Sequence, residues 1–96
     1  MKDIEKRIAN RYDRRYGKLD PMKLLAKLLE EAGELARAII RNDHINAEEE
    51  LGDVVIVISS LARYLKTDIE TATETKLQEH ERRLIEWESK RDGGKK

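Results

Sequence analysis

The segment EEELGDVVIVISSLAR, residues 48–63, is the most informative part of the sequence about the fold. A helix over Val54–Ile58 would be apolar on every side, and such a helix is typically buried all round. β-Branched side chains also suit a strand, which is the competing interpretation. The acidic run before this segment and Leu61-Ala62-Arg63 after it favour helix. We therefore predict a helix that lies at the centre of a bundle.

Three further helices are predicted on either side of this central one. The first covers about 2–16, and its apolar residues recur at every fourth position: Ile4, Ile8, Tyr12 and Tyr16. The second runs to about residue 41, and the last covers about 68–91. Three pairs of residues are typical helix-start signals, namely Asp20 with Pro21, Asn46 with Glu49, and Thr67 with Glu70.

These elements predict an all-α fold, a four-helix antiparallel bundle. We expect a single domain over residues 1–92 and a frayed C-terminal tail at 93–96. A chain of 96 residues buries a limited apolar area, so we expect dimerisation to complete the bundle.

The composition excludes several classes of function. Twenty acidic and 20 basic side chains balance to a net charge of zero, which argues against non-specific nucleic-acid binding and a polybasic membrane anchor. The absence of cysteine excludes disulfides, thiolate metal sites and thiol nucleophiles. No apolar run approaches the roughly 20 residues that a membrane span needs. We expect a cytoplasmic protein that binds neither nucleic acid nor membrane.

Two acidic pairs adjoin the most apolar stretches of the second and third predicted helices. Glu31 and Glu34 are three residues apart, and Glu50 and Asp53 repeat that spacing, so each pair shares one helix face. Carboxylates near a buried face repel one another and lose hydration, and a hard divalent cation would offset both costs. The simpler interpretation, a solvated face of surface ion pairs, also fits glutamates at helical spacing.

Together these segments resemble a known family. Glu30-Glu31-x-x-Glu34, followed by a connector and Glu50-x-x-Asp53, is similar to the motif of the MazG-like all-α nucleotide pyrophosphohydrolases. The resemblance covers about residues 20–85. It implies an Mg²⁺-dependent enzyme, with Mn²⁺ as a substitute ion, that cleaves (deoxy)nucleoside triphosphates to the monophosphate and pyrophosphate in nucleotide-pool house-cleaning.

The resemblance also implies roles for particular residues. The metal ligands would be Glu31, Glu34, Glu50 and Asp53, and Glu30 would orient or deprotonate the attacking water. Basic residues of the last helix would hold the phosphates, and the candidates are Lys76, Arg82 and Arg83. The family forms homodimers or homotetramers. The rings available to stack on a base are Tyr12, Tyr16, Tyr64 and Trp87, of which the first two lie on an apolar stripe and the last suits a subunit interface.

Two alternatives stay open. A phosphoribosyl-ATP pyrophosphohydrolase of histidine synthesis shares the acidic pattern, but it is expected to carry a tyrosine-histidine pair after the aspartate, where this chain has Ile56-Val57-Ile58. A non-catalytic helical interaction module is the other, and the retention of all five acids counts against it. A di-iron bundle is rejected, because no glutamate lies three residues before His44 or His80.

Overall fold

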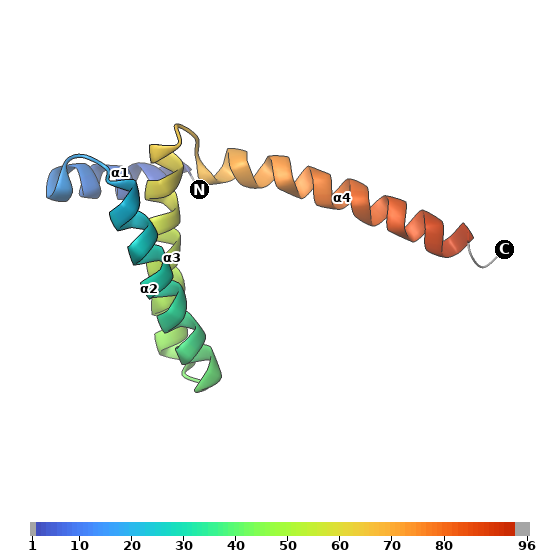
Figure 1. Cartoon of the computed structure of the whole chain (residues 1–96), viewed down its shortest axis with the longest axis horizontal. Coiled ribbons are helices and arrows are strands. Elements are labelled where there is room, and N and C mark those ends of the chain that lie inside the picture. Colours follow the sequence, from blue (N-terminus) through green and yellow to red (C-terminus); the bar gives the residue numbers. More distant parts are fainter. Residues whose placement is uncertain (1, 94–96) are drawn as a thin grey trace.

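The fold of residues 2–93 was obtained as a computed structural model, and it consists of four α-helices (Figure 1). They are α1 (Lys2–Tyr16), α2 (Pro21–Ile40), α3 (His44–Tyr64) and α4 (Ile69–Gly93). No strand occurs in this part of the chain, so the all-α prediction is confirmed and the strand alternative for residues 54–58 is wrong. Of the predicted tail, Gly93 is the last residue of α4, and 94–96 lie outside the described residues.

Acidic side chains set where the helices begin. Asp20 caps α2 as predicted, and its Oδ1 accepts from the backbone N–H groups of Met22 and Lys23 at 3.1 and 3.4 Å. The caps of α3 and α4 are Asp43 and Asp68, not the predicted Asn46 and Thr67. An aspartate caps as well as the residues we predicted, and both of these lie where the chain turns into the helix.

Helix α3 contacts each of the other three helices, which confirms its central place. α2 and α3 lie side by side and antiparallel, and α1 crosses the end of this pair where α3 finishes (Figure 1). The buried apolar residues all belong to these three helices: Ile8, Leu24, Ala38, Val57 and Ala62. The core of the chain therefore follows α3, with α2 packed along its length and α1 packed across its end.

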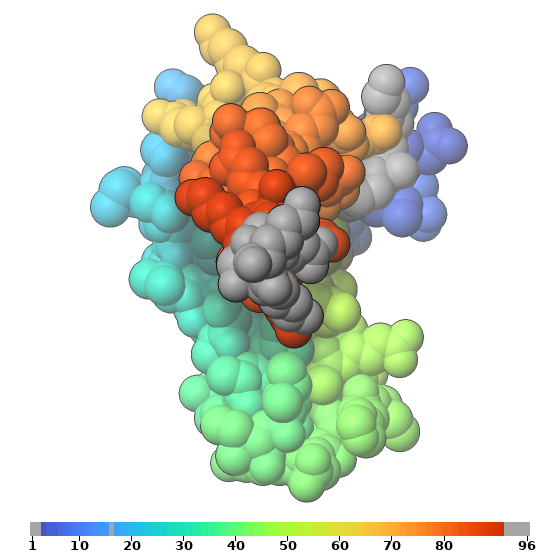
Figure 2. Space-filling model, turned by 90° about the vertical axis from the view of Figure 1, so that its right-hand side faces the viewer, coloured from blue at the N-terminus to red at the C-terminus, as the bar shows by residue number. Residues whose placement is uncertain are grey.

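Helix α4 leaves this core and extends away from it, as Figure 1 shows from the side and Figure 2 almost end-on. The molecule consequently measures 61 × 36 × 25 Å. Large apolar side chains of α4 are exposed, including Leu77, Leu84, Ile85 and Trp87. Within one chain the antiparallel packing is thus limited to α2 and α3, and α4 has a face that no described residue covers.

The apolar segment of α3 is less buried than its sequence predicted. Val57 is only 2% exposed, but Val54 and Ile56 are half-buried and Ile58 is 39% exposed. The physical reason is that α1 and α2 cover two sides of α3, whereas α4 does not fold back over the remaining side. No helix of the described residues is long and apolar enough to cross a membrane.

Two polar contacts fix α1 across the end of α3. Arg63 donates from a guanidinium nitrogen to Asp13 Oδ1 at 2.6 Å. The buried carboxylate of Glu5 accepts from the backbone N–H of Ile69, the first residue of α4, at 2.7 Å. This second contact satisfies an N–H group that has no partner inside its own helix.

We predict that Glu5→Ala lowers the free energy of unfolding by about 1 kcal/mol, because the α4 N-terminus loses a buried acceptor. Urea denaturation followed by circular dichroism measures this change. Glu5→Gln keeps an acceptor oxygen and should lose less. Equal stability of the alanine variant and the wild type would contradict the assigned contact.

Candidate metal centre

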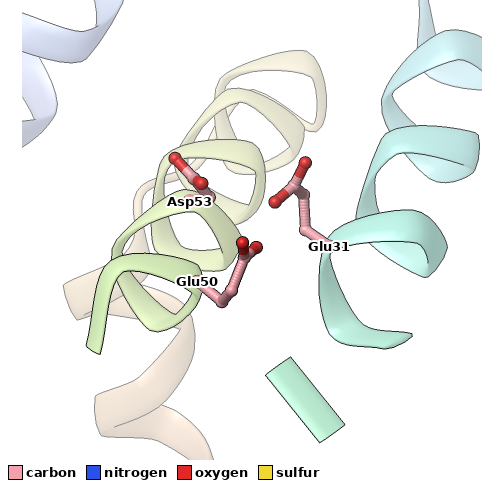
Figure 3. Close-up of side chains that lie close together, drawn as sticks. All are labelled: Glu31, Glu50 and Asp53. Atoms are coloured by element: carbon pink, nitrogen blue, oxygen red, sulfur yellow. The ribbon is translucent and has the colours of Figure 1, made fainter. Parts of the chain in front are cut away.

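The packing of α2 against α3 brings the two acidic motifs together. One carboxylate oxygen from each of Glu31, Glu50 and Asp53 lies within 4.8 Å of the others. Glu31 extends from α2 toward the two residues of α3, and the three carboxyl groups meet across the seam (Figure 3). The juxtaposition predicted for the two motifs is therefore present for these three acids.

The three acids differ in burial. Glu31 is 5% exposed, Glu50 is half-buried and Asp53 is exposed. The Oε2 atom of Glu50 is inaccessible to solvent and accepts no hydrogen bond from any described residue. A buried carboxylate oxygen without a partner costs free energy, so this atom marks where a cation would stabilise the site.

The crowding of carboxyl groups perturbs their protonation. The hydrogen bond with Glu31, then burial, then the nearby Glu34 carboxylate raise the pKa of Glu50 from 4.5 to about 7. The same hydrogen bond lowers the pKa of Glu31, because a protonated Glu50 donates to it, and Lys27 lowers it further. Below about pH 7 the cluster thus holds a proton between Glu31 and Glu50.

The other two predicted acids lie at the edge of the cluster. Glu34 is half-buried and close enough to raise the pKa of Glu50, but it is not among the three whose oxygens converge. Glu30 is exposed, and its carboxylate lies 3.7 Å from the Lys27 ammonium group. Glu30 is therefore accessible to water beside the cluster.

Lys27 is a site residue that the sequence analysis did not identify. Its Nζ lies 3.2 Å from Glu31 Oε1, and this hydrogen bond is the main reason why the pKa of Lys27 is raised. The spacing between Lys27 and Glu31 could have identified it, since residues four apart on a helix are neighbours. Lys27 also lines a cavity of about 370 Å³ between α1 and α2, together with Tyr12, Leu19 and Leu24.

The predicted phosphate-binding residues are not brought to the cluster within one chain. They lie on the part of α4 that extends away from α2 and α3 (Figure 1). Each also pairs with a carboxylate of its own helix. Lys76 and Arg83 share Glu79 at 3.0 and 2.5 Å, and Arg82 lies 3.9 Å from Glu86.

The aromatic candidates are similarly dispersed. Tyr12 is half-buried against the cavity beside Lys27. Tyr64 and Trp87 are exposed, and the guanidinium of Arg91 stacks 5.3 Å from the centre of the Trp87 ring. The side chain of Tyr16 lies outside the described residues. Of these rings, Tyr12 is the one that lines a cavity next to the acidic motif.

The donor set fits a hard divalent cation. Mg²⁺ prefers carboxylate oxygens and retains several waters, which suits a cluster that is buried on one side and exposed at Asp53. The raised pKa of Glu50 and its unpartnered oxygen both indicate that the carboxylates lack a positive charge to balance them in the metal-free protein. The carboxylates present thus match the group that the motif implies.

Comparison with known proteins gives matches over the same region. The family model for the MazG nucleotide pyrophosphohydrolase domain matches residues 19–86. The uncharacterized protein YpjD of Bacillus subtilis (strain 168) is 36% identical over 84 residues, covering 75% of each chain. Among solved structures, the Bacillus-conserved MazG protein, described as a nucleotide pyrophosphohydrolase, superposes with a TM-score of 0.74 at 34% identity, over 82% of this chain and 86% of that one.

We predict that divalent-cation binding at this site depends on pH through Glu50. Its pKa is raised above the ordinary value of 4.5, so its contribution to the stability of the metal-free protein is complete below about pH 4.5 and is lost as the pH rises through about 7. A cation requires the ionised form, so affinity should rise over the same interval and level off above it.

The measurement is isothermal titration with Mg²⁺ in pairs of buffers that differ in ionisation enthalpy. At about pH 6 the heat should depend on the buffer, because binding displaces the proton from Glu50. At about pH 8 this dependence should nearly vanish. A Glu50→Gln variant is the control and should bind weakly at either pH. Buffer-independent heats at both pH values would contradict the assignment.

Proposed function

Because the chain belongs to the MazG nucleotide pyrophosphohydrolase family, we propose that it is an Mg²⁺-dependent hydrolase of (deoxy)nucleoside triphosphates. The products are the monophosphate and pyrophosphate, and the role is cytoplasmic house-cleaning of the nucleotide pool. The observation that carries the proposal is the convergence of Glu31, Glu50 and Asp53 from two separate helices.

In this proposal Glu31, Glu50 and Asp53 hold the cation, and Glu34 completes the ligand set from the edge of the cluster. A bound Mg²⁺ supplies charge neutralisation to the phosphate oxygens and makes water easier to deprotonate. Mn²⁺ substitutes, since it accepts the same oxygen ligands.

Glu30 orients the attacking water and accepts its proton. It is the exposed member of the acidic motif on α2, adjacent in sequence to the buried Glu31. A carboxylate that water can reach beside a metal centre is the kind of group that serves as a general base. The chemistry of Glu30 is thus separate from the metal ligation by its neighbour.

The basic residues of α4 act in an assembled oligomer. Lys76, Arg82 and Arg83 belong to α4, which extends away from the core of its own chain, and the apolar side chains Leu77, Leu84 and Trp87 are exposed on the same helix. Covering these apolar side chains stabilises an assembly by roughly 25 cal/mol per Å² of area removed from water. We propose a homodimer or homotetramer in which α4 of one subunit brings its basic residues to the phosphates bound by another.

The two alternative functions have less support. This chain lacks the tyrosine-histidine pair that a phosphoribosyl-ATP enzyme is expected to carry after the aspartate, and it has Ile56-Val57-Ile58 there. A non-catalytic module has no use for three converging carboxylates, one of which has a buried oxygen without a partner.

The domain boundaries, residues 1–92 with a tail at 93–96, stay a prediction.

We predict that the purified protein with Mg²⁺ converts a triphosphate to its monophosphate and pyrophosphate in a single cleavage. A panel of standard, deoxy and modified triphosphates, analysed by phosphorus NMR, identifies both the products and the preferred base. Release of two separate phosphates would indicate stepwise cleavage and contradict the mechanism. Absence of turnover across the panel, with Mg²⁺ bound, would favour the non-catalytic module.

We predict that Glu30→Gln lowers kcat by about 10²–10⁴-fold, the range typical of a lost general base. Mg²⁺ affinity should be nearly unchanged in this variant, because Glu30 is not among the converging acids. Glu50→Gln is the matched control and should lose both turnover and metal affinity. Loss of Mg²⁺ binding in Glu30→Gln would place Glu30 in the ligand set instead.

A further inference from the structure

An arginine-lined groove runs between α1 and α3. Arg7, Arg11 and Arg14 recur at intervals of four and three residues, so they share one face of α1. With Arg15 they line an open groove of about 800 Å³, and Ile56 of α3 contributes to its wall. We call this set of four arginines with Ile56 the arginine groove.

Three of the four arginines in the groove have no ion-pair partner among the described residues. No carboxylate of residues 2–93 forms an ion pair with Arg7, Arg11 or Arg14, although the sequence holds as many acidic as basic side chains. Lys76, Arg82 and Arg83 of α4 differ, because each lies beside a glutamate of its own helix. Arg7, Arg11 and Arg14 therefore give the groove a local surplus of positive charge and guanidinium donors without an ion-pair partner among the described residues.

The groove lies next to the candidate metal centre. Ile56 follows Asp53 by three residues on α3, so the two are neighbours on that helix and about 4.5 Å apart along its axis. The ion pair between Arg63 and Asp13 holds α1 against α3 about two turns beyond Ile56. Through Ile56, one wall of the arginine groove thus lies about one helical turn from Asp53, the exposed acid of the cluster.

From this placement we infer that the arginine groove binds the pyrophosphate end of the nucleotide, a step that rests on the proposed function. Guanidinium groups form paired hydrogen bonds with phosphate oxygens, and a row of three suits two successive phosphates. Hydrolysis beside Asp53 then leaves the departing pyrophosphate among the arginines. A long nucleic acid fits less well, because its charge would continue into the acidic cluster.

The test is a calorimetric titration of the metal-free protein, in EDTA, with inorganic tripolyphosphate. The wild type should bind it, and Arg7→Gln/Arg11→Gln should bind at least tenfold more weakly. The matched control, Arg41→Gln/Lys90→Gln, removes the same formal charge from exposed positions outside the groove and should bind like the wild type. Arg7→Lys/Arg11→Lys preserves charge and should fall between them, which separates lost hydrogen bonding from misfolding.

Three results would overturn the inference: no uptake by the wild type, an equal loss in the control, or tighter binding of a short DNA duplex than of tripolyphosphate. Failure of the proposed function is distinguishable. If the protein binds tripolyphosphate through Arg7 and Arg11 but hydrolyses no triphosphate, the groove proposal stands and the proposed enzymatic function fails. If Arg7→Gln/Arg11→Gln hydrolyses triphosphates with an unchanged KM, the enzymatic function stands and the groove proposal fails.

Discussion

The structure depends on holding like charges together at the seam between α2 and α3. Three carboxyl groups with oxygens within 4.8 Å of one another repel, and burial of Glu31 adds a cost of lost hydration. Packing of the buried residues Leu24, Ala38 and Val57 opposes that repulsion. The bare protein relieves the rest by keeping a proton on Glu50, whose raised pKa records the conflict. A divalent cation bound by these carboxylates would relieve the repulsion without the proton. The same repulsion that burdens the metal-free fold would then favour cation binding.

A second constraint is that one chain does not bury all of its apolar surface. Ile58 is exposed on α3, and α4 displays Leu84 and Trp87 while touching little of its own chain. Most of the stability of a helix in a protein comes from tertiary packing of its apolar face. The contacts of Glu5 and Asp68 fix only its first turn. The direction of α4 is therefore set at its N-terminus, and the remaining turns are available to another subunit.

Local rules predicted those features that depend on neighbouring residues. The helical period gave the four helices, Asp20 with Pro21 located the start of α2, and the spacing of Glu50 and Asp53 put both carboxylates on one face of α3. Features that depend on distant segments were missed. The partial exposure of α3 follows from the path of α4, and the cap that Glu5 gives to Ile69 joins residues 64 positions apart. Glu34 follows Glu31 at the spacing by which Asp53 follows Glu50, yet its carboxylate is not among the three that converge.

Although the net charge is zero, acidic and basic side chains gather in separate regions of the molecule. The acidic cluster lies on α2 and α3, and Arg7, Arg11 and Arg14 lie on the helix that crosses the end of that pair. A polyphosphate with a cation needs both signs at once: carboxylates for the cation, and guanidinium groups for the phosphates beyond its reach. Neither region alone discriminates against other anions or cations, because an isolated acidic cluster attracts any hard cation and an isolated basic groove attracts any anion. Their adjacency at Asp53 and Ile56 favours a ligand that carries both charges within a few ångströms, and a metal-bound nucleoside triphosphate has that arrangement.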